Sequence, residues 1–197
     1  MAALYERMGD LPPALQMFLA GCPPELEARR HRIACRQVVT RTLLALAGGV
    51  RRMAYWNLAP EYPGPVDHLQ VMHLLIGKLP LLGYRDGRLD CRHPAAGTFE
   101  LLARQLAGAR AVTRVRASGP PALHAVSVDR PGRGPLLVLW DQRDAFDGED
   151  EPAAAVTWPW PAAAAEVTDA FGRVRTVASR DGELRLAVSD TPLFITE

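Results

Sequence analysis

The chain has 197 residues, 48% of them hydrophobic and 23% charged, which is enough for one large domain or two small ones with a sizeable core. Its 23 Lys and Arg residues balance 22 Asp and Glu residues, and this argues against a nucleic-acid or acidic-lipid partner. No apolar run reaches transmembrane length, and the N-terminus lacks the apolar stretch of a signal peptide, so we expect no membrane contact and a cytoplasmic location for the chain as given.

Cysteine and histidine spacing gives no metal or cofactor signature. Cys22, Cys35 and Cys91 are odd in number and too far apart for paired metal ligands, so they predict free thiols rather than a disulfide framework. His68 and His73 are five residues apart, which suits a metal-binding pair on a helix poorly. We therefore expect neither a metal nor a cofactor.

The first half of the chain alternates predicted helices with predicted short strands. The apolar run 14–20 lies between prolines and a glycine, which favours a strand buried on both faces. The strongest helix has one apolar stripe, with arginines on the opposite face, and Gly48 and Gly49 stand where a left-handed cap is needed. The order is typical of parallel α/β structure. The expected elements are helix 2–8, strand 14–20, helix 25–47, strand 50–58 and helix 93–109.

From residue 111 onward, the pattern changes to short alternating segments separated by turn residues. Seven such segments at this spacing predict an antiparallel β-sandwich. The segment "WPWP" at 158–161 is interrupted by prolines and cannot form a central strand. The expected strands cover residues 111–117, 123–130, 135–142, 165–171, 173–179, 183–189 and 192–196.

This order of motifs resembles the last third of a clan A-type glycoside hydrolase, in which a (β/α)8 barrel precedes a small β-sandwich. The short helix 2–8 and "LPPALQMFLAGCPP" are similar to the sixth helix and seventh strand of such a barrel, and residues 27–58 to its seventh helix and eighth strand. "HPAAGTFELLARQLAGA" is similar to the eighth helix. The ending "DGELRLAVSDTPLFI" is similar to the closing strands of the sandwich.

The resemblance implies a sugar site at the end of the second predicted strand. Active sites of these barrels lie at the carboxyl ends of the strands. Trp56 would stack on a sugar, and Asn57 and Glu61 would bind its hydroxyl groups. Packing in the core or against another domain is the alternative for Tyr55 and Trp56, because large aromatic side chains are usually buried.

The resemblance fails at the residues that define the chemistry. A retaining glycosidase needs two carboxyl groups about 5 Å apart, and the acid/base of the family would lie upstream of Met1. At the nucleophile position the chain has Leu19 or Ala20. Glu25 and Glu27 follow soon after, but acidic residues also suit the first turn of a helix.

We therefore predict an α/β plus all-β chain: a partial (β/α) barrel of the last two βα units over residues 1–110, then an antiparallel β-sandwich over 111–197. The predicted function is a glycoside-hydrolase-like fragment that is inactive alone. The alternatives are a non-catalytic carbohydrate-binding module and a structural protein that completes a barrel in trans. The expected partners are a carbohydrate ligand and a second copy or partner chain that covers the open barrel edge.

Two further features have competing interpretations. The acidic segment 141–152 does not match the EF-hand spacing, so a solvated loop is favoured over a calcium site. Trp140, Trp158 and Trp160 flank this segment. They fit either packing, in the core of the sandwich or at its seam against the barrel, or an aromatic carbohydrate-binding face, and packing is favoured.

Overall fold

The computed structural model describes residues 2–55, 58–59, 77–85 and 88–197. The chain divides into two compact units. The first comprises residues 1–34 and 54–97, and the second comprises residues 35–53 and 98–197. Each unit is described separately below. Among the described residues, no helix combines the length and the hydrophobicity needed to cross a bilayer.

The first unit is built from short helices and one small hairpin. The hairpin pairs β1 with β2 in antiparallel fashion. Gly83 lies opposite Cys91 in this hairpin, and a Cβ atom at position 83 would come within 2.5 Å of the Cys91 sulfur, so a larger residue there would displace the Cys91 side chain. The elements are α1 (Ala2–Glu6), η1 (Met8–Asp10), α2 (Pro13–Gln16), the first part of α3 (Pro24–Ala47), β1 (Leu82–Arg85), β2 (Arg88–Arg92) and the start of α5 (Pro94–Leu106).

The strand predicted over residues 14–20 is wrong. This stretch forms α2 followed by turns, with Pro13 in the first turn of the helix. A short apolar run cannot distinguish a buried strand from a buried helical turn, and proline at a helix start favours the helix. Residues 51–55 of the second predicted strand are also not in a strand. Every pairing between described strands is antiparallel, so the predicted pair of parallel barrel strands is not found there, and these residues form no closed barrel.

Helix α3 ends as its sequence predicts. Gly49 adopts a left-handed conformation with φ of 92°. The Gly49 amide donates to the Leu46 carbonyl, and the Val50 amide donates to the Ala45 carbonyl. These two bonds form a Schellman cap, which satisfies carbonyl groups that the last helical turn leaves unpaired.

The second unit contains a six-stranded antiparallel sheet in the order β3-β4-β5-β10-β7-β8, and a two-stranded sheet of β6 and β9. The six-stranded sheet includes all the later predicted strands except 183–189, which form β9 of the small sheet. Sequence analysis missed β6, because it ends on a proline that only an outer strand tolerates. The strands are β3 (Ala111–Val115), β4 (Leu123–Asp129), β5 (Leu136–Asp141), β6 (Ala154–Pro159), β7 (Ala164–Asp169), β8 (Val174–Ala178), β9 (Glu183–Val188) and β10 (Leu193–Thr196).

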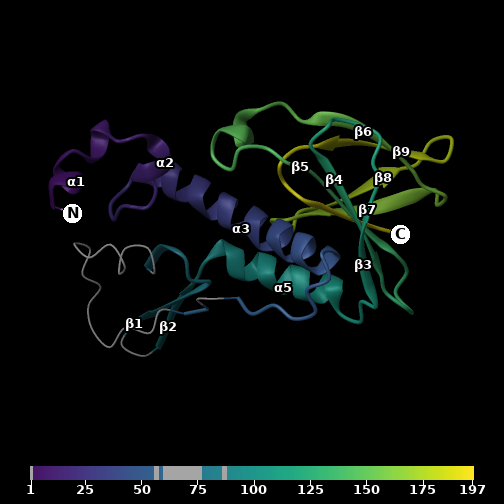
Figure 1. The fold of residues 1–197 in the computed structure, drawn as a ribbon, viewed down its shortest axis with the longest axis horizontal. Coiled ribbons are helices and arrows are strands. Elements are labelled where there is room, and N and C mark those ends of the chain that lie inside the picture. The colour runs from purple at the N-terminus through teal and green to yellow at the C-terminus, as the bar shows by residue number, and fades with distance from the viewer. Residues whose placement is uncertain (1, 56–57, 60–76, 86–87) are drawn as a thin grey trace. The chain divides into compact units, whose positions relative to one another are not determined.

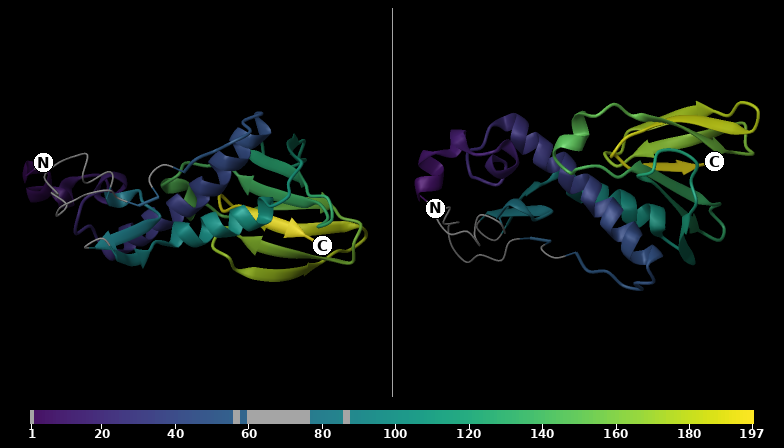
Figure 2. Two further views of the ribbon diagram at one scale, coloured as in Figure 1. Left: turned by 90° about the horizontal axis from the view of Figure 1, so that it is seen from below. Right: turned by 45° about the horizontal axis from the view of Figure 1, so that its top comes forward.

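The six-stranded sheet is covered on both faces. On one face, Leu137 and Leu139 of β5 join a core with the inward side chains of β6 and β9. Leu136, Val138 and Trp140 alternate with them and are also buried, so they point to the other face. The second half of α3 and most of α5 lie over that face (Figures 1 and 2). A strand buried on both faces reads as a continuous apolar run, which is the pattern of β5.

We predict that Leu139→Ala lowers the free energy of unfolding by about 3 kcal/mol, because Leu139 is fully buried in the core and its truncation leaves a cavity. Chemical denaturation followed by circular dichroism measures this change. Val174→Ala is the control, since Val174 is 60% exposed on β8 and its truncation should change little. Equal losses in both variants would contradict this placement of the core.

Candidate functional site

The three residues predicted to bind sugar, Trp56, Asn57 and Glu61, lie outside the described residues, so their role stays a prediction. His68 and His73 also lie outside them. The described residues contain two polar clusters instead, one in each unit. Both involve residues of α3.

The cluster of the first unit is centred on Glu27, in the first turn of α3. Arg30 Nη2 donates to Glu27 Oε1 at 2.6 Å, and Lys78 Nζ donates to Glu27 Oε2 at 2.7 Å. The Cys22 thiol contacts Glu27 Oε2 at 3.4 Å. Arg30 is itself buried and also donates to the backbone carbonyl of Lys78. The side of α3 that carries the arginines is therefore not exposed to solvent along its whole length. Glu25, the other acidic residue of this turn, is exposed.

The surroundings of Glu27 keep its carboxyl group ionised. Burial alone would raise its pKa, but the hydrogen bonds and positive charges of Arg30 and Lys78 outweigh burial and lower the pKa to about 2. A catalytic acid needs a raised pKa, so that it carries a proton at neutral pH. Among the described residues, the charges that shift the pKa of Glu27 are those of Arg30 and Lys78, and both are positive. In a retaining glycosidase, by contrast, the neighbour of each catalytic carboxyl group is a second carboxyl group.

Two imidazole rings extend this cluster. His31 and His93 are stacked with ring centroids 5.3 Å apart, and His31 Nε2 lies 3.5 Å from Glu27 Oε1. Burial, together with the charge of Arg30, lowers the pKa of His31 to about 4, and burial also lowers the pKa of His93. Both rings are therefore neutral at pH 7. His93 Nε2 lies 3.9 Å from the Cys91 sulfur.

The cluster does not have the geometry of a metal site. Within the described part of the chain, no group of three or more His, Cys, Asp or Glu side chains could hold an ion. Cys22, Cys35 and Cys91 are all free thiols. The arrangement is a partly buried ion-pair cluster with neutral histidines at its side.

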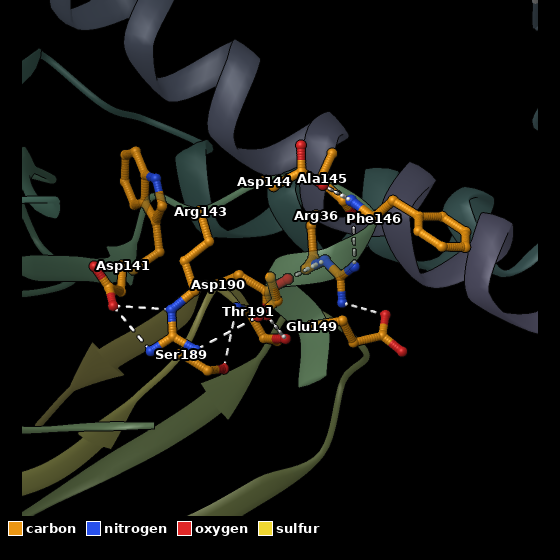
Figure 3. A network of polar contacts seen from close by, with 12 residues as sticks. Arg36, Asp141, Arg143, Asp144, Ala145, Phe146, Glu149, Ser189, Asp190 and Thr191 are labelled. Carbon is orange, nitrogen blue, oxygen red and sulfur yellow. Dashed lines mark hydrogen bonds and ion pairs between the residues drawn. The ribbon is translucent and has the colours of Figure 1, made fainter. Parts of the chain in front are cut away.

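The cluster of the second unit is centred on Arg36 of α3 (Figure 3). Its side chain is only 7% exposed. Nη1 donates to Glu149 Oε2 at 2.8 Å, and Nε lies 3.0 Å from Asp190 Oδ2. Nη2 donates to the Ala145 carbonyl at 3.4 Å. One guanidinium group of the helix thus holds the acidic loop that contains η2 (Asp147–Asp150) and the turn before β10.

A second arginine, Arg143, organises the acidic loop from inside. It binds Asp141 Oδ2 through Nε and Nη2, both at 2.9 Å. It also donates to the carbonyls of Glu151 and Pro152, both at 2.8 Å. Gly148 lies against this arginine, and a Cβ atom there would come within 2.4 Å of the Arg143 Cβ atom. The loop is therefore a folded structure held by Arg36 and Arg143.

The carboxyl group of Asp190 is poorly satisfied. Burial raises its pKa, and the charge of Glu149 adds to this effect, while Arg36 and Arg143 oppose it. Oδ2 lies near Arg36 but accepts no well-aligned hydrogen bond from the described residues, and Asp141 Oδ1 likewise lacks one. Asp190 and Glu149 share one guanidinium group, which explains why Arg36 does not compensate Asp190 fully.

The tryptophans of the sandwich form no exposed aromatic face. Trp140 is 1% exposed, stacks on His124 and donates to Gln142 Oε1 at 3.2 Å. Trp160 is 7% exposed and donates to the Ala164 carbonyl at 3.1 Å. Trp158 is half-buried against the core. The prediction that these side chains are core residues is confirmed.

Sequence analysis missed Arg36, Arg143, Asp141 and the stacking of His31 on His93. The available signal was weak. Arg36 lies between Cys35 and Val38 on the buried side of the helix stripe, and an arginine at such a position must find an anionic partner. Its partner could not be named, because Glu149 is 113 residues away in the chain.

Comparisons with known proteins give a partial likeness to a solved structure. No protein-family model matches the chain, and no curated protein matches it. The chain is similar in structure to a family 39 glycoside hydrolase from the gut symbiont Bacteroides cellulosilyticus WH2, with 14% sequence identity and a TM-score of 0.42. The match covers 62% of this chain and 22% of that one, so it involves about a fifth of the solved protein.

We predict that His31 makes the folded chain sensitive to mild acid. Its folded pKa of about 4 lies below its ordinary value of 6.5, so the unfolded chain takes up the proton first and stability falls as the pH drops from about 6.5 through about 4. Glu27, with a folded pKa of about 2 against 4.5, adds a second loss below about pH 4.5. Denaturation at about pH 7.5 and about pH 5 should show a smaller difference for His31→Phe than for the unmodified chain. An identical difference would contradict a neutral buried His31.

We predict that Arg36→Met lowers the free energy of unfolding by about 3 kcal/mol, because it removes the buried cation that contacts both Glu149 and Asp190. Arg41→Met is the matched control, since Arg41 is exposed on the same helix. Asp190→Asn should cost less than Arg36→Met, because burial already disfavours the charge of Asp190. An Arg36→Met variant as stable as the Arg41→Met variant would contradict this assignment.

Proposed function

We propose that this chain is a non-catalytic part of a glycoside-hydrolase-like protein, in which the β-sandwich serves as a structural support for two helices. The observation that carries the proposal is the buried Arg36 of α3, bound to Glu149 and Asp190 of the sandwich unit. A buried ion pair of this kind fixes one arrangement of the groups that it joins.

Further contacts within the second unit support this role. Thr98 of α5 donates to the Ala170 carbonyl at 2.7 Å, and both groups are buried. Arg130, at the end of β4, donates to Gln105 Oε1 of α5 at 2.9 Å. Polar contacts thus hold α5 at two separate points, and Arg36 holds α3. Two helices attached in this way to a sheet behave as one folding unit with it.

The state of Glu27 supports the non-catalytic part of the proposal. Glu25 and Glu27 are the first acidic residues after the position that the resemblance gives to the nucleophile. Glu25 is exposed, whereas Arg30 and Lys78 both bind the carboxylate of Glu27. A nucleophile bound by two cations is weakened, and a low pKa removes any role as an acid. Leu19, at the position that the resemblance gives to the nucleophile, has an apolar side chain and is buried.

The proposal extends to the location of the catalytic groups and to the partner of this chain. The resemblance suggests that the catalytic carboxyl groups lie on a chain segment or subunit other than this one, and that such a segment covers the first unit. A carbohydrate-binding role for Trp56, Asn57 and Glu61 is the alternative that the sequence supports.

We predict that the purified chain does not hydrolyse aryl glycosides above a blank without protein, because the Glu27 carboxylate is bound by both Arg30 and Lys78. Release of nitrophenol from a panel of nitrophenyl α- and β-glycosides measures this, with circular dichroism to show that the protein is folded. Turnover that is lost in Glu27→Gln but kept in Glu25→Gln would overturn the proposal and assign Glu27 a catalytic role.

A further inference from the structure

We propose that strand β3 is a docking edge for an acidic peptide, which binds in extended conformation as an added strand of the six-stranded sheet. This proposal does not depend on the function proposed above. It rests on the pairing of β3, on its charge and on the way in which one of its arginines is held.

Strand β3 is the open edge of the second unit. Within the described residues it pairs with β4 alone, and no proline occurs between Ala111 and Ser118. The other outer strands are less suitable. β6 ends on Pro159, with Pro161 close behind, and β8 lies against β9. An outer strand with its amide groups intact can pair with a further strand.

The charge of this edge selects an acidic partner. Arg110, Arg114 and Arg116 are exposed, and no acidic residue occurs in residues 110–118. Arg114 lies in β3, and Arg110 and Arg116 lie directly before and after the strand. Their even separations favour one side of the chain for all three. Alternate residues of an extended chain are about 6.8 Å apart, and the same spacing applies to alternate residues of an added strand. Acidic side chains at alternate positions of a peptide therefore match the arginines.

The same row of arginines argues against a second copy of β3 as the partner, because two such rows would repel each other. It also favours a peptide over nucleic acid. The exposed residues of β3 include no aromatic side chain on which a base could stack, and the net charge of the chain is only +1. Within the described residues, the side of β3 that faces away from β4 pairs with no other strand, and a peptide can use its backbone groups.

Arg114 is held in place by its neighbours on the sheet. Its Nη2 atom lies 3.0 Å from His124 Nδ1 on β4, and His124 stacks on Trp140 of β5 with ring centroids 4.9 Å apart. Burial and the charge of Arg114 lower the pKa of His124, so the ring is neutral at pH 7 and its Nδ1 can accept the bond. A guanidinium group held in this way loses less freedom when it binds a carboxylate.

Fluorescence anisotropy on the full chain tests the proposal. The probe is a fluorescein-labelled peptide of eight residues that alternates glutamate and valine. We expect saturable binding that weakens as salt is added, and that falls about tenfold or more in the Arg114→Glu/Arg116→Glu variant. The matched control is Arg175→Glu/Arg185→Glu, which reverses two exposed charges on β8 and β9 and should bind as the unmodified chain does. Circular dichroism establishes that both variants are folded.

Modified peptides separate strand pairing from simple attraction of charge. An extended peptide pairs through one edge only, so N-methylation of its valines or of its glutamates should abolish binding in one case and spare it in the other. A peptide of the same composition with its glutamates consecutive should bind more weakly. Absence of binding would overturn the proposal. So would equal binding of all these peptides, or tighter binding of a single-stranded oligonucleotide.

Discussion

The second unit depends on the burial of one guanidinium group. Arg36 is placed by α3 among apolar side chains that cover the sheet, and its charge must be matched there because the loss of hydration costs several kcal/mol. Glu149 and Asp190 supply the match. To do so, the acidic loop has to fold towards the helix and the turn before β10 has to face it. The positions of a helix, a loop and a turn are thus fixed by one side chain, and Arg143 and Gly148 give the loop the internal order that this requires.

Sequence patterns predicted those elements in which the order of apolar and polar residues along the chain follows the order of buried and exposed side chains. β9 alternates strictly between exposed and buried residues, and β5 is a continuous apolar run buried on both faces, so both were readable. The end of α3 was also readable, because Gly49 supplies the left-handed residue that the cap requires. The run 14–20 was misread, since apolar composition alone does not separate a turn of helix from a strand. The prolines near β6 hid a strand that pairs on one side only.

The polar clusters were much less predictable, because their partners come from distant parts of the chain. The arginines of α3 look alike in sequence, yet Arg30 and Arg36 are buried and Arg41 is exposed. Their different roles arise from Lys78, Glu149 and Asp190, and nothing local to the helix points to these residues. The acidic segment suggested a solvated loop, and four of its six acidic residues are exposed, but its attachment to α3 was not predicted. Its net charge was visible, but the cation that Glu149 binds was not.

The two clusters also show why burial alone does not decide the chemistry of a carboxyl group. Glu27 has two cations to itself, Arg30 and Lys78, and they outweigh its burial and lower its pKa. Asp190 shares Arg36 with Glu149, and burial prevails and raises its pKa. Both cations donate hydrogen bonds to Glu27, whereas Asp190 Oδ2 accepts none from the described residues, so burial is outweighed only at Glu27. By this criterion Glu27 is the better ion-pair anchor, and Asp190 is the group that retains a proton more readily. A proton on Asp190 would weaken its contact with Arg36 without removing the bond from Arg36 to Glu149. The shared arginine thus keeps the acidic loop attached to α3 in either protonation state of Asp190.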